Sequence, residues 1–205
     1  ALFRREAMLR ARHGGWAVGA GLFAALGSLA PFAIGAEASL LASVGAGFLW
    51  IVLGIAVFLG VEGLFEDDLR SGAFEQFLLS PQGLVRAILM KMVVAWLFLL
   101  APLGLVAPLL LIGYGSSLLG LLALGIASPG LVFTASVIAA LASGQRRGAP
   151  LLVFCALPLI IPALVFGPQA GLGDAVPFLA LAAYSLQAVA ICPFLAAAAI
   201  RVHLQ

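Results

Sequence analysis

Charged residues are scarce in this chain of 205 residues: they make up 9% of it, while 64% is hydrophobic and the mean hydropathy is +1.24. Soluble domains carry about 25% charged residues. A chain with so little charge cannot cover a surface that faces water, so the composition predicts an integral membrane protein. The net charge of +2 is too small to favour nucleic acid as a partner.

Sequence motifs for catalysis and for metal binding are also missing. The two cysteines, Cys155 and Cys192, lie in apolar runs far from each other, which gives no CxxC motif and no disulfide framework. We interpret both as apolar core residues. His13 and His203 stand beside basic residues and are expected to be solvated. With no nucleophile motif, phosphate loop or paired catalytic carboxylates, we predict no catalytic, cofactor-binding or metal site on this chain.

Six apolar stretches are each long enough to cross a bilayer, which takes about 20 helical residues. They lie at about 16–36, 39–61, 87–112, 117–142, 150–167 and 177–200. Backbone groups in lipid must be bonded internally, and the alternation typical of a barrel is missing, so all six are expected to be helices. A signal peptide is the alternative for the first stretch, but its apolar run of about 20 residues exceeds the usual 7–15. We therefore predict one all-α transmembrane domain over 1–205.

The positions of the basic residues predict the topology. With both termini in the cytoplasm, all ten Lys and Arg fall on that side, as the positive-inside rule requires. The external loops then carry only Glu37 and Asp174. No span has a charge near its middle, which argues against a proton- or ion-coupled carrier. Arg86 and Lys91 lie in the first turns of the third span and are expected to snorkel to the interface.

A polar segment, 62–81, separates the second and third spans. It holds five of the eight acidic residues: Glu62, Glu66, Asp67, Asp68 and Glu75. Its apolar residues follow helical spacing on each side of Gly72, but with a change of phase, so we predict two short amphipathic helices with a bend at Gly72. Ser80 and Pro81 match the N-cap and first position of the next helix.

The acidic character of this segment predicts what it contacts. Helices that lie on membranes are usually basic, and the inner leaflet is negatively charged, so lipid is an unfavourable surface for it. A protein partner fits better than bare membrane contact. We predict that the partner-binding residues are Glu66, Asp67, Asp68, Gly72, Phe74, Glu75, Gln76, Phe77, Leu78 and Pro81.

Three stretches carry a resemblance to a known family. The stretch "EDDLRSGAFEQFLLSP", followed by Lys91, resembles the coupling helix of ATP-binding-cassette permeases of the ABC-2 export class. Together, "LFEDDLRSGAFEQFLLSP", "QRRGAPLLVFCALPLIIPALVFG" and "CPFLAAAAIRVHLQ" resemble the heme exporter protein B family, the membrane subunit of the cytochrome c maturation exporter. Gly63 departs from the family pattern, which usually has Arg there.

The resemblance implies a multi-pass permease subunit of the bacterial inner membrane. Such a subunit would form a homodimer and receive energy, through segment 62–81, from a soluble subunit that hydrolyses ATP. Further implied partners are heme-handling membrane subunits of types C and D and a periplasmic heme chaperone. Two roles are then open for the energy: export of heme itself, or release of the heme-loaded chaperone. A scaffold without transport, and a permease for another cargo, remain as alternatives.

Small residues and prolines complete the expectations for the spans. "GWAVGAG" and "GAGFLWIVLG" permit close helix approach and are expected to serve the dimer. Prolines at 102, 108, 129, 158 and 162 are expected to kink spans three to five. The segment 164–177 is either a re-entrant turn or a plain loop after a kinked helix.

Overall fold

The computed structural model describes residues 2–35, 37–79, 83–115, 117–143 and 149–204, and within these ranges every regular element is an α-helix. The elements are α1 (Leu2–His13), α2 (Gly15–Ile34), α3 (Ala38–Val61), α4 (Glu66–Arg70), α5 (Ala73–Leu79), α6 (Gly83–Gly113), α7 (Leu119–Ala142), α8 (Ala149–Ala170) and α9 (Ala175–His203). The all-α prediction is confirmed for the described residues.

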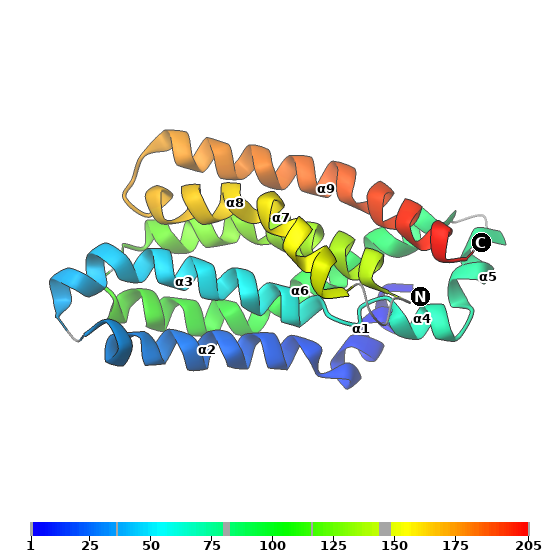
Figure 1. The fold of residues 1–205 in the computed structure, drawn as a ribbon, viewed down its shortest axis with the longest axis horizontal. Helices are drawn as coiled ribbons and strands as arrows, with labels where there is room; N and C mark the ends of the chain where they lie inside the picture. Colours follow the sequence, from blue (N-terminus) through cyan, green and yellow to red (C-terminus); the bar gives the residue numbers. More distant parts are fainter. Residues whose placement is uncertain (1, 36, 80–82, 116, 144–148, 205) are drawn as a thin grey trace.

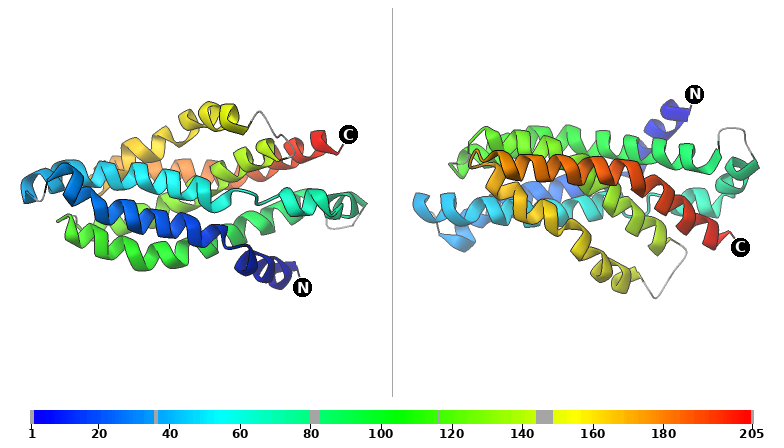
Figure 2. Two further views of the ribbon diagram at one scale, coloured as in Figure 1. Left: turned by 60° about the horizontal axis from the view of Figure 1, so that its bottom comes forward. Right: turned by 90° about the horizontal axis from the view of Figure 1, so that it is seen from above.

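Six long helices run lengthwise through the molecule and alternate in direction (Figure 1). The connections α2–α3, α6–α7 and α8–α9 lie at one end, which we call the outer end. Both termini lie at the opposite end with α1, α4 and α5, and the views of Figure 2 agree on this. We call this opposite end the polar end. The long helices begin and end within a few residues of the stretches predicted from hydropathy.

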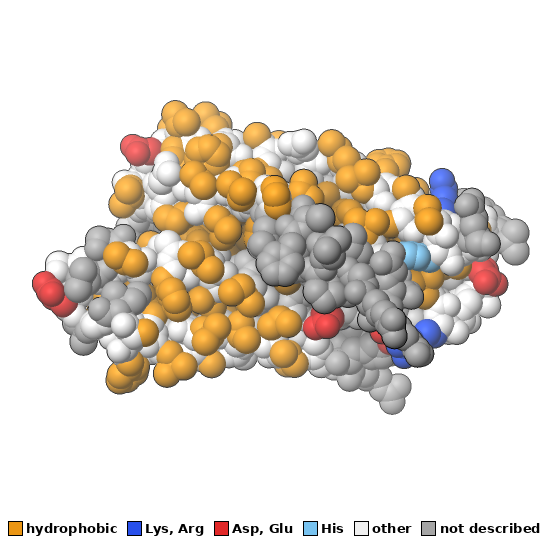
Figure 3. Space-filling model, viewed as in Figure 1, with side chains coloured by type: hydrophobic (Ala, Val, Ile, Leu, Met, Phe, Trp, Pro, Cys, Tyr) orange, Lys and Arg blue, Asp and Glu red, His pale blue; other side chains and the backbone are white. Residues whose placement is uncertain are grey.

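The lateral surface of the bundle is apolar. Five helices, α2, α3, α6, α7 and α9, are long and apolar enough to cross a membrane. The part of α8 whose side chains are described, Pro158–Ala170, is apolar but shorter. Figure 3 shows hydrophobic side chains spread over the middle of one face, with charged side chains mainly toward the two ends. Lipid is the solvent that such a band requires.

Helix α7 lies at the centre of the bundle and packs against α9, α8, α6 and α3. Small residues allow these close contacts, since Ala123, Ala127 and Ala135 are almost fully buried. Its polar groups are bonded within the protein: Ser136 Oγ donates to the Val132 carbonyl at 2.7 Å, and Trp96 Nε1 donates to Ser128 Oγ at 2.9 Å. Such internal bonding is what a polar group in an apolar surrounding requires.

Glycines bring helices of the same chain together. At Gly19 of α2, a Cβ would collide with the Ala56 carbonyl and crowd Gly60 of α3, and at Gly45 it would collide with the ring of Tyr114. The small residues expected to serve a dimer therefore include some that α2–α3 and α3–α6 packing already uses. At Gly21 and Gly47 a Cβ would meet no other atom within 4 Å.

The proline-rich region near α8 resolves the alternative left open above. Helix α8 continues through Pro158, Pro162 and Pro168 to Ala170, and α9 begins at Ala175 after a short turn. The re-entrant alternative for 164–177 is thus wrong, because the chain forms a helix end and a tight connection there. α6 and α7 also continue through their internal prolines.

Candidate functional site

The polar segment folds as its helical phase predicted. α4 and α5 are separated by Ser71 and Gly72, and Gly72 has φ +70°, a conformation that side chains with a Cβ rarely adopt. A second left-handed glycine, Gly63 with φ +69°, follows the end of α3. The chain therefore turns twice on glycine as it leaves α3, and the two turns set the directions of α4 and α5.

Two aromatic rings hold this segment against the bundle. Phe65 and Phe74 are almost fully buried, and their ring centroids lie 6.2 Å apart at a tilt of 42°. Both belong to the main hydrophobic core, together with Leu64 from the preceding turn. Burying two such rings stabilises the segment by several kcal/mol, about 1.5–3 for each side chain.

The outer face of the segment is acidic and polar. Glu66 pairs with Arg70 at 3.1 Å across one helical turn, and Asp67 is exposed. Three of the predicted contact residues on α5, Glu75, Gln76 and Leu78, are exposed, and Phe77 is half-buried against the core. Pro81, like the predicted N-cap Ser80, lies outside the described residues. Phe74 was also predicted to contact the partner, but it is buried in the chain's own core and is not available to one. The structure gathers Asp67, Glu75, Gln76 and Leu78 on the exposed surface of α4 and α5 at the polar end.

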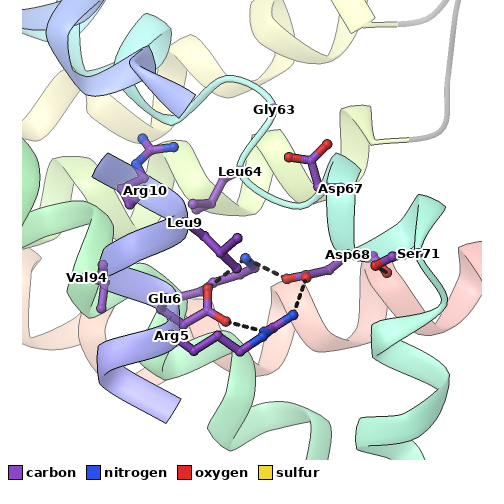
Figure 4. Close-up of a pocket in the computed structure, with 11 residues that line it drawn as sticks. Arg5, Glu6, Leu9, Arg10, Gly63, Leu64, Asp67, Asp68, Ser71 and Val94 are labelled. Carbon is purple, nitrogen blue, oxygen red and sulfur yellow. Dashed lines mark hydrogen bonds and ion pairs between the residues drawn. The ribbon is translucent and has the colours of Figure 1, made fainter. Parts of the chain in front are cut away.

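Asp68 points the other way, into a closed cycle of four charged side chains (Figure 4). Lys91 Nζ lies 2.6 Å from Asp68 Oδ2 and 2.9 Å from Glu6 Oε2. Arg5 closes the cycle at 2.8 Å from Glu6 Oε1 and 3.4 Å from Asp68 Oδ1. We call these four residues the ion-pair ring. It joins three helices: α1, α4 and α6.

Burial makes three members of this ring sensitive to substitution. Glu6, Asp68 and Lys91 are 5%, 3% and 9% exposed, whereas the Arg5 side chain is 44% exposed. Removing one partner of a buried pair leaves an uncompensated charge and costs about 3–5 kcal/mol, while exposed pairs contribute little. The ring carries two positive and two negative charges, so its members compensate one another.

Two expectations from the sequence need correction here. Lys91 does not snorkel to the membrane interface: it is buried, because two carboxylates compensate its charge. Asp68 does not share the outward acidic surface of its neighbours, because it extends toward Glu6, Arg5 and Lys91. A predicted contact of Asp68 with a partner would therefore require the ring to open.

A cavity of about 360 Å³ lies beside the ring. Its walls come from α1, the turn before α4, α4 and α6, and they include Asp67, Ser71 and Arg10. Arg10 is buried and donates to the carbonyl of Gly60 in the last turn of α3, where a cation complements the helix dipole. Burial lowers the pKa of Arg10 to about 10, so it stays charged at neutral pH.

Glu6, Arg5 and Arg10 were absent from the predicted site, although the sequence carries a signal for the first of them. Glu6 is the only acidic residue before Glu37 and stands within a run of arginines. Lys91 likewise lies eight residues inside α6, where an unpaired cation would be costly. An isolated acid and an isolated base at the edges of apolar stretches suggest a pair, but only the fold shows that they meet. Among the residues searched, no three His, Cys, Asp or Glu side chains are grouped to hold a metal ion.

Comparison with known proteins adds a family. The profile of the CcmB protein family matches residues 1–203. A heme exporter protein B of Escherichia coli K12 is 41% identical over 87% of this chain and 86% of its own length. The protein of the same name from Pseudomonas aeruginosa is 36% identical over 88% and 85%, respectively. That from Rhodobacter capsulatus is 33% identical over 100% of this chain and 99% of the relative.

Proposed function

The chain belongs to the CcmB family, whose members are membrane components of a heme export system, and on that premise we propose that it is the permease subunit of an ATP-driven transporter in cytochrome c biogenesis. A separate subunit would bind and hydrolyse ATP. The energy would serve either to export heme or to release a heme-loaded periplasmic chaperone. Further partners would be a second copy of this chain and the heme-handling membrane subunits of types C and D.

The observation that carries the proposal is the surface formed by α4 and α5. It projects from the polar end of an otherwise apolar bundle, and it displays Asp67, Glu75, Gln76 and Leu78. Anionic lipid headgroups would repel its carboxylates. A soluble protein with basic or amide groups complements them, and the exposed Leu78 supplies an apolar contact.

The proposed topology has six spans with both termini in the cytoplasm of a bacterium, in the inner membrane. Three observations support it. The six long helices alternate in direction, both termini lie at the polar end, and the described ends of α1, α6 and α9 at that end carry Arg4, Arg86 and Arg201. The turns at the outer end carry Glu37 and Asp174, which agrees with the positive-inside rule.

Co-purification from native membranes tests the proposal. We expect the chain to bring down an ATP-hydrolysing subunit, and we expect Asp67→Asn combined with Glu75→Gln to lose that subunit or to hold it only at low salt. Removing a desolvated charge at an interface costs about 2–5 kcal/mol, whereas a rim charge changes on-rate and salt dependence. Glu37→Gln combined with Asp174→Asn is the matched control, because it neutralises two carboxylates at the outer end.

The outcomes separate the alternatives. A permease coupled through this surface is supported if the ATP-hydrolysing subunit is lost from the variant with Asp67→Asn and Glu75→Gln but retained by the control variant. Heme-handling proteins without any ATP-hydrolysing subunit, in the unsubstituted chain as well, would replace the proposal with a membrane scaffold. An ATP-hydrolysing subunit without heme-handling proteins would instead indicate a permease for another cargo.

A further inference from the structure

The ion-pair ring links α4 to α6 through side chains, although the backbones of these two helices are not in close contact. Among the described elements, the backbone of α4 approaches only that of α5. The Asp68 side chain nevertheless pairs with Lys91 on α6 and with Arg5 on α1, beside the cavity of about 360 Å³. Directly between α4 and the long helix α6, therefore, the structure shows a charged side-chain bridge rather than packed backbone.

The bridge differs physically from the aromatic attachment of the same segment. Phe65 and Phe74 lie in the hydrophobic core, where the stabilisation is non-directional and follows the apolar area that is buried. The Asp68–Lys91 pair joins one oxygen to one nitrogen at 2.6 Å in a buried place, so separating it leaves each buried charge with one fewer partner: Asp68 keeps only Arg5, and Lys91 keeps only Glu6. The position of α4 relative to α6 is therefore set by a contact between two particular atoms as well as by the buried area of the rings.

The position of Lys91 extends the connection. It lies on α6, a helix of 31 residues that crosses from the polar end to the outer end. Lys91 also pairs with Glu6 of α1, and α1 reaches α3 through the bond from Arg10 to the Gly60 carbonyl. Asp68 on α4 is thereby linked by ion pairs to α6 and α1, and α1 is in turn hydrogen-bonded to the end of α3.

We propose that Asp68 and Lys91 are the positioning residues that transmit movement of the α4–α5 segment to α6 and, through Glu6, to α1. This inference rests on the proposed function, since the movement would come from the ATP-hydrolysing subunit. The cavity leaves room for α4 to shift toward or away from the bundle. The ring is thus a coupling element on the inside of the segment, distinct from the docking surface on its outside.

Asp68→Asn is the test, because it removes the charge with little change in shape and leaves Lys91 paired with Glu6. It is examined in the complex with the ATP-hydrolysing subunit. Subunit binding and ATP hydrolysis are expected to stay close to the unsubstituted level. Cytochrome c assembly per ATP hydrolysed is expected to fall by about 5- to 150-fold, the range of typical coupling energies. Asp68→Glu, which restores the charge, should recover most of the loss.

The matched control is Glu62→Gln, which neutralises an exposed carboxylate of the same connecting segment. It should behave as the unsubstituted chain does. A double-mutant cycle tests the direct pair: Asp68→Asn combined with Lys91→Met should lower the ratio of assembly to hydrolysis by less than the product of the two single effects.

The results have distinct meanings. The inference is wrong if Asp68→Asn keeps the normal ratio of cytochrome c assembly to ATP hydrolysis. It is also wrong if subunit binding, hydrolysis and assembly all fall in proportion to the amount of folded protein, because the ring is then only structural. If the unsubstituted chain binds no ATP-hydrolysing subunit, the proposed function itself fails, and this inference fails with it. Only a lowered ratio of assembly to hydrolysis, recovered by Asp68→Glu, supports the inference.

Discussion

Lys91 Nζ lies between two carboxylates, 2.6 Å from Asp68 Oδ2 and 2.9 Å from Glu6 Oε2, and the side chain is 10% exposed. Through this one ammonium group, α6 is paired with both α1 and α4. A buried cation is tolerated here because its two partners are buried with it. The stability of the polar end should therefore depend on the balance of these charges.

Lys91→Met should lower the free energy of unfolding by about 3–5 kcal/mol, because it leaves Glu6 and Asp68 buried with only the half-exposed Arg5 as partner. Adding Glu6→Gln and Asp68→Asn should recover most of that loss, since no uncompensated carboxylate then remains. Thermal unfolding in detergent, followed by tryptophan fluorescence, measures both. A triple variant less stable than Lys91→Met would contradict the charge-balance argument.

Gly72→Val should misdirect α5 and weaken association with the ATP-hydrolysing subunit while the protein still inserts in the membrane. The φ of +70° is strained for a residue with a Cβ, by about 1–2 kcal/mol, and more for a β-branched one. Gly72→Asn should have a much smaller effect, because asparagine tolerates this region. Normal association of the valine variant in a pull-down would show that the bend is not fixed.

Cysteine labelling should place the two ends of the bundle on opposite sides of the membrane. In a background without Cys155 and Cys192, Glu37→Cys and Asp174→Cys should react with an impermeant reagent in intact spheroplasts. Leu78→Cys, on exposed α5, should react only after permeabilisation. The opposite pattern would invert the proposed orientation, and a mixed pattern for positions 37 and 174 would contradict the six-span arrangement.

Gly45→Ala should destabilise the protein more than Gly47→Ala. A Cβ at Gly45 collides with the ring of Tyr114, whereas a Cβ at Gly47 meets no other atom within 4 Å. Overpacking of this kind costs about 1–3 kcal/mol. The midpoint of thermal unfolding compares the two variants directly. Equal midpoints would mean that Tyr114 can move aside without loss of its bond to the Gly27 carbonyl.

The sequence predicted the positions of the six long helices well, because hydropathy and helix length are nearly sufficient for apolar segments in lipid. It also predicted α4, α5 and the bend at Gly72, since the spacing of Phe65, Leu69, Phe74 and Phe77 changes phase there. These features are local, and local periodicity encodes them.

Contacts between distant segments were beyond the reach of the sequence. Asp67 and Asp68 are adjacent acids in the chain, yet one is exposed and the other is paired with Lys91, because successive helical residues point about 100° apart. Which of them faces inward depends on where α1 and α6 lie. Similarly, Gly19 and Gly45 were expected to serve a dimer, and only the packing of α2, α3 and α6 shows that the chain uses them itself.

Tyr114 Oη donates to the Gly27 carbonyl at 2.6 Å, and Ser117 Oγ donates to the Gly171 carbonyl at 2.5 Å, so neutral hydrogen bonds clasp the α6–α7 connection to α2 and to the α8–α9 turn. The outer end can therefore act as a pivot. Helix α6 is about 46 Å long at 1.5 Å per residue, and Lys91 lies toward its other end. A displacement of a few ångströms at Lys91 therefore corresponds to a tilt of α6 by only a few degrees about the outer end.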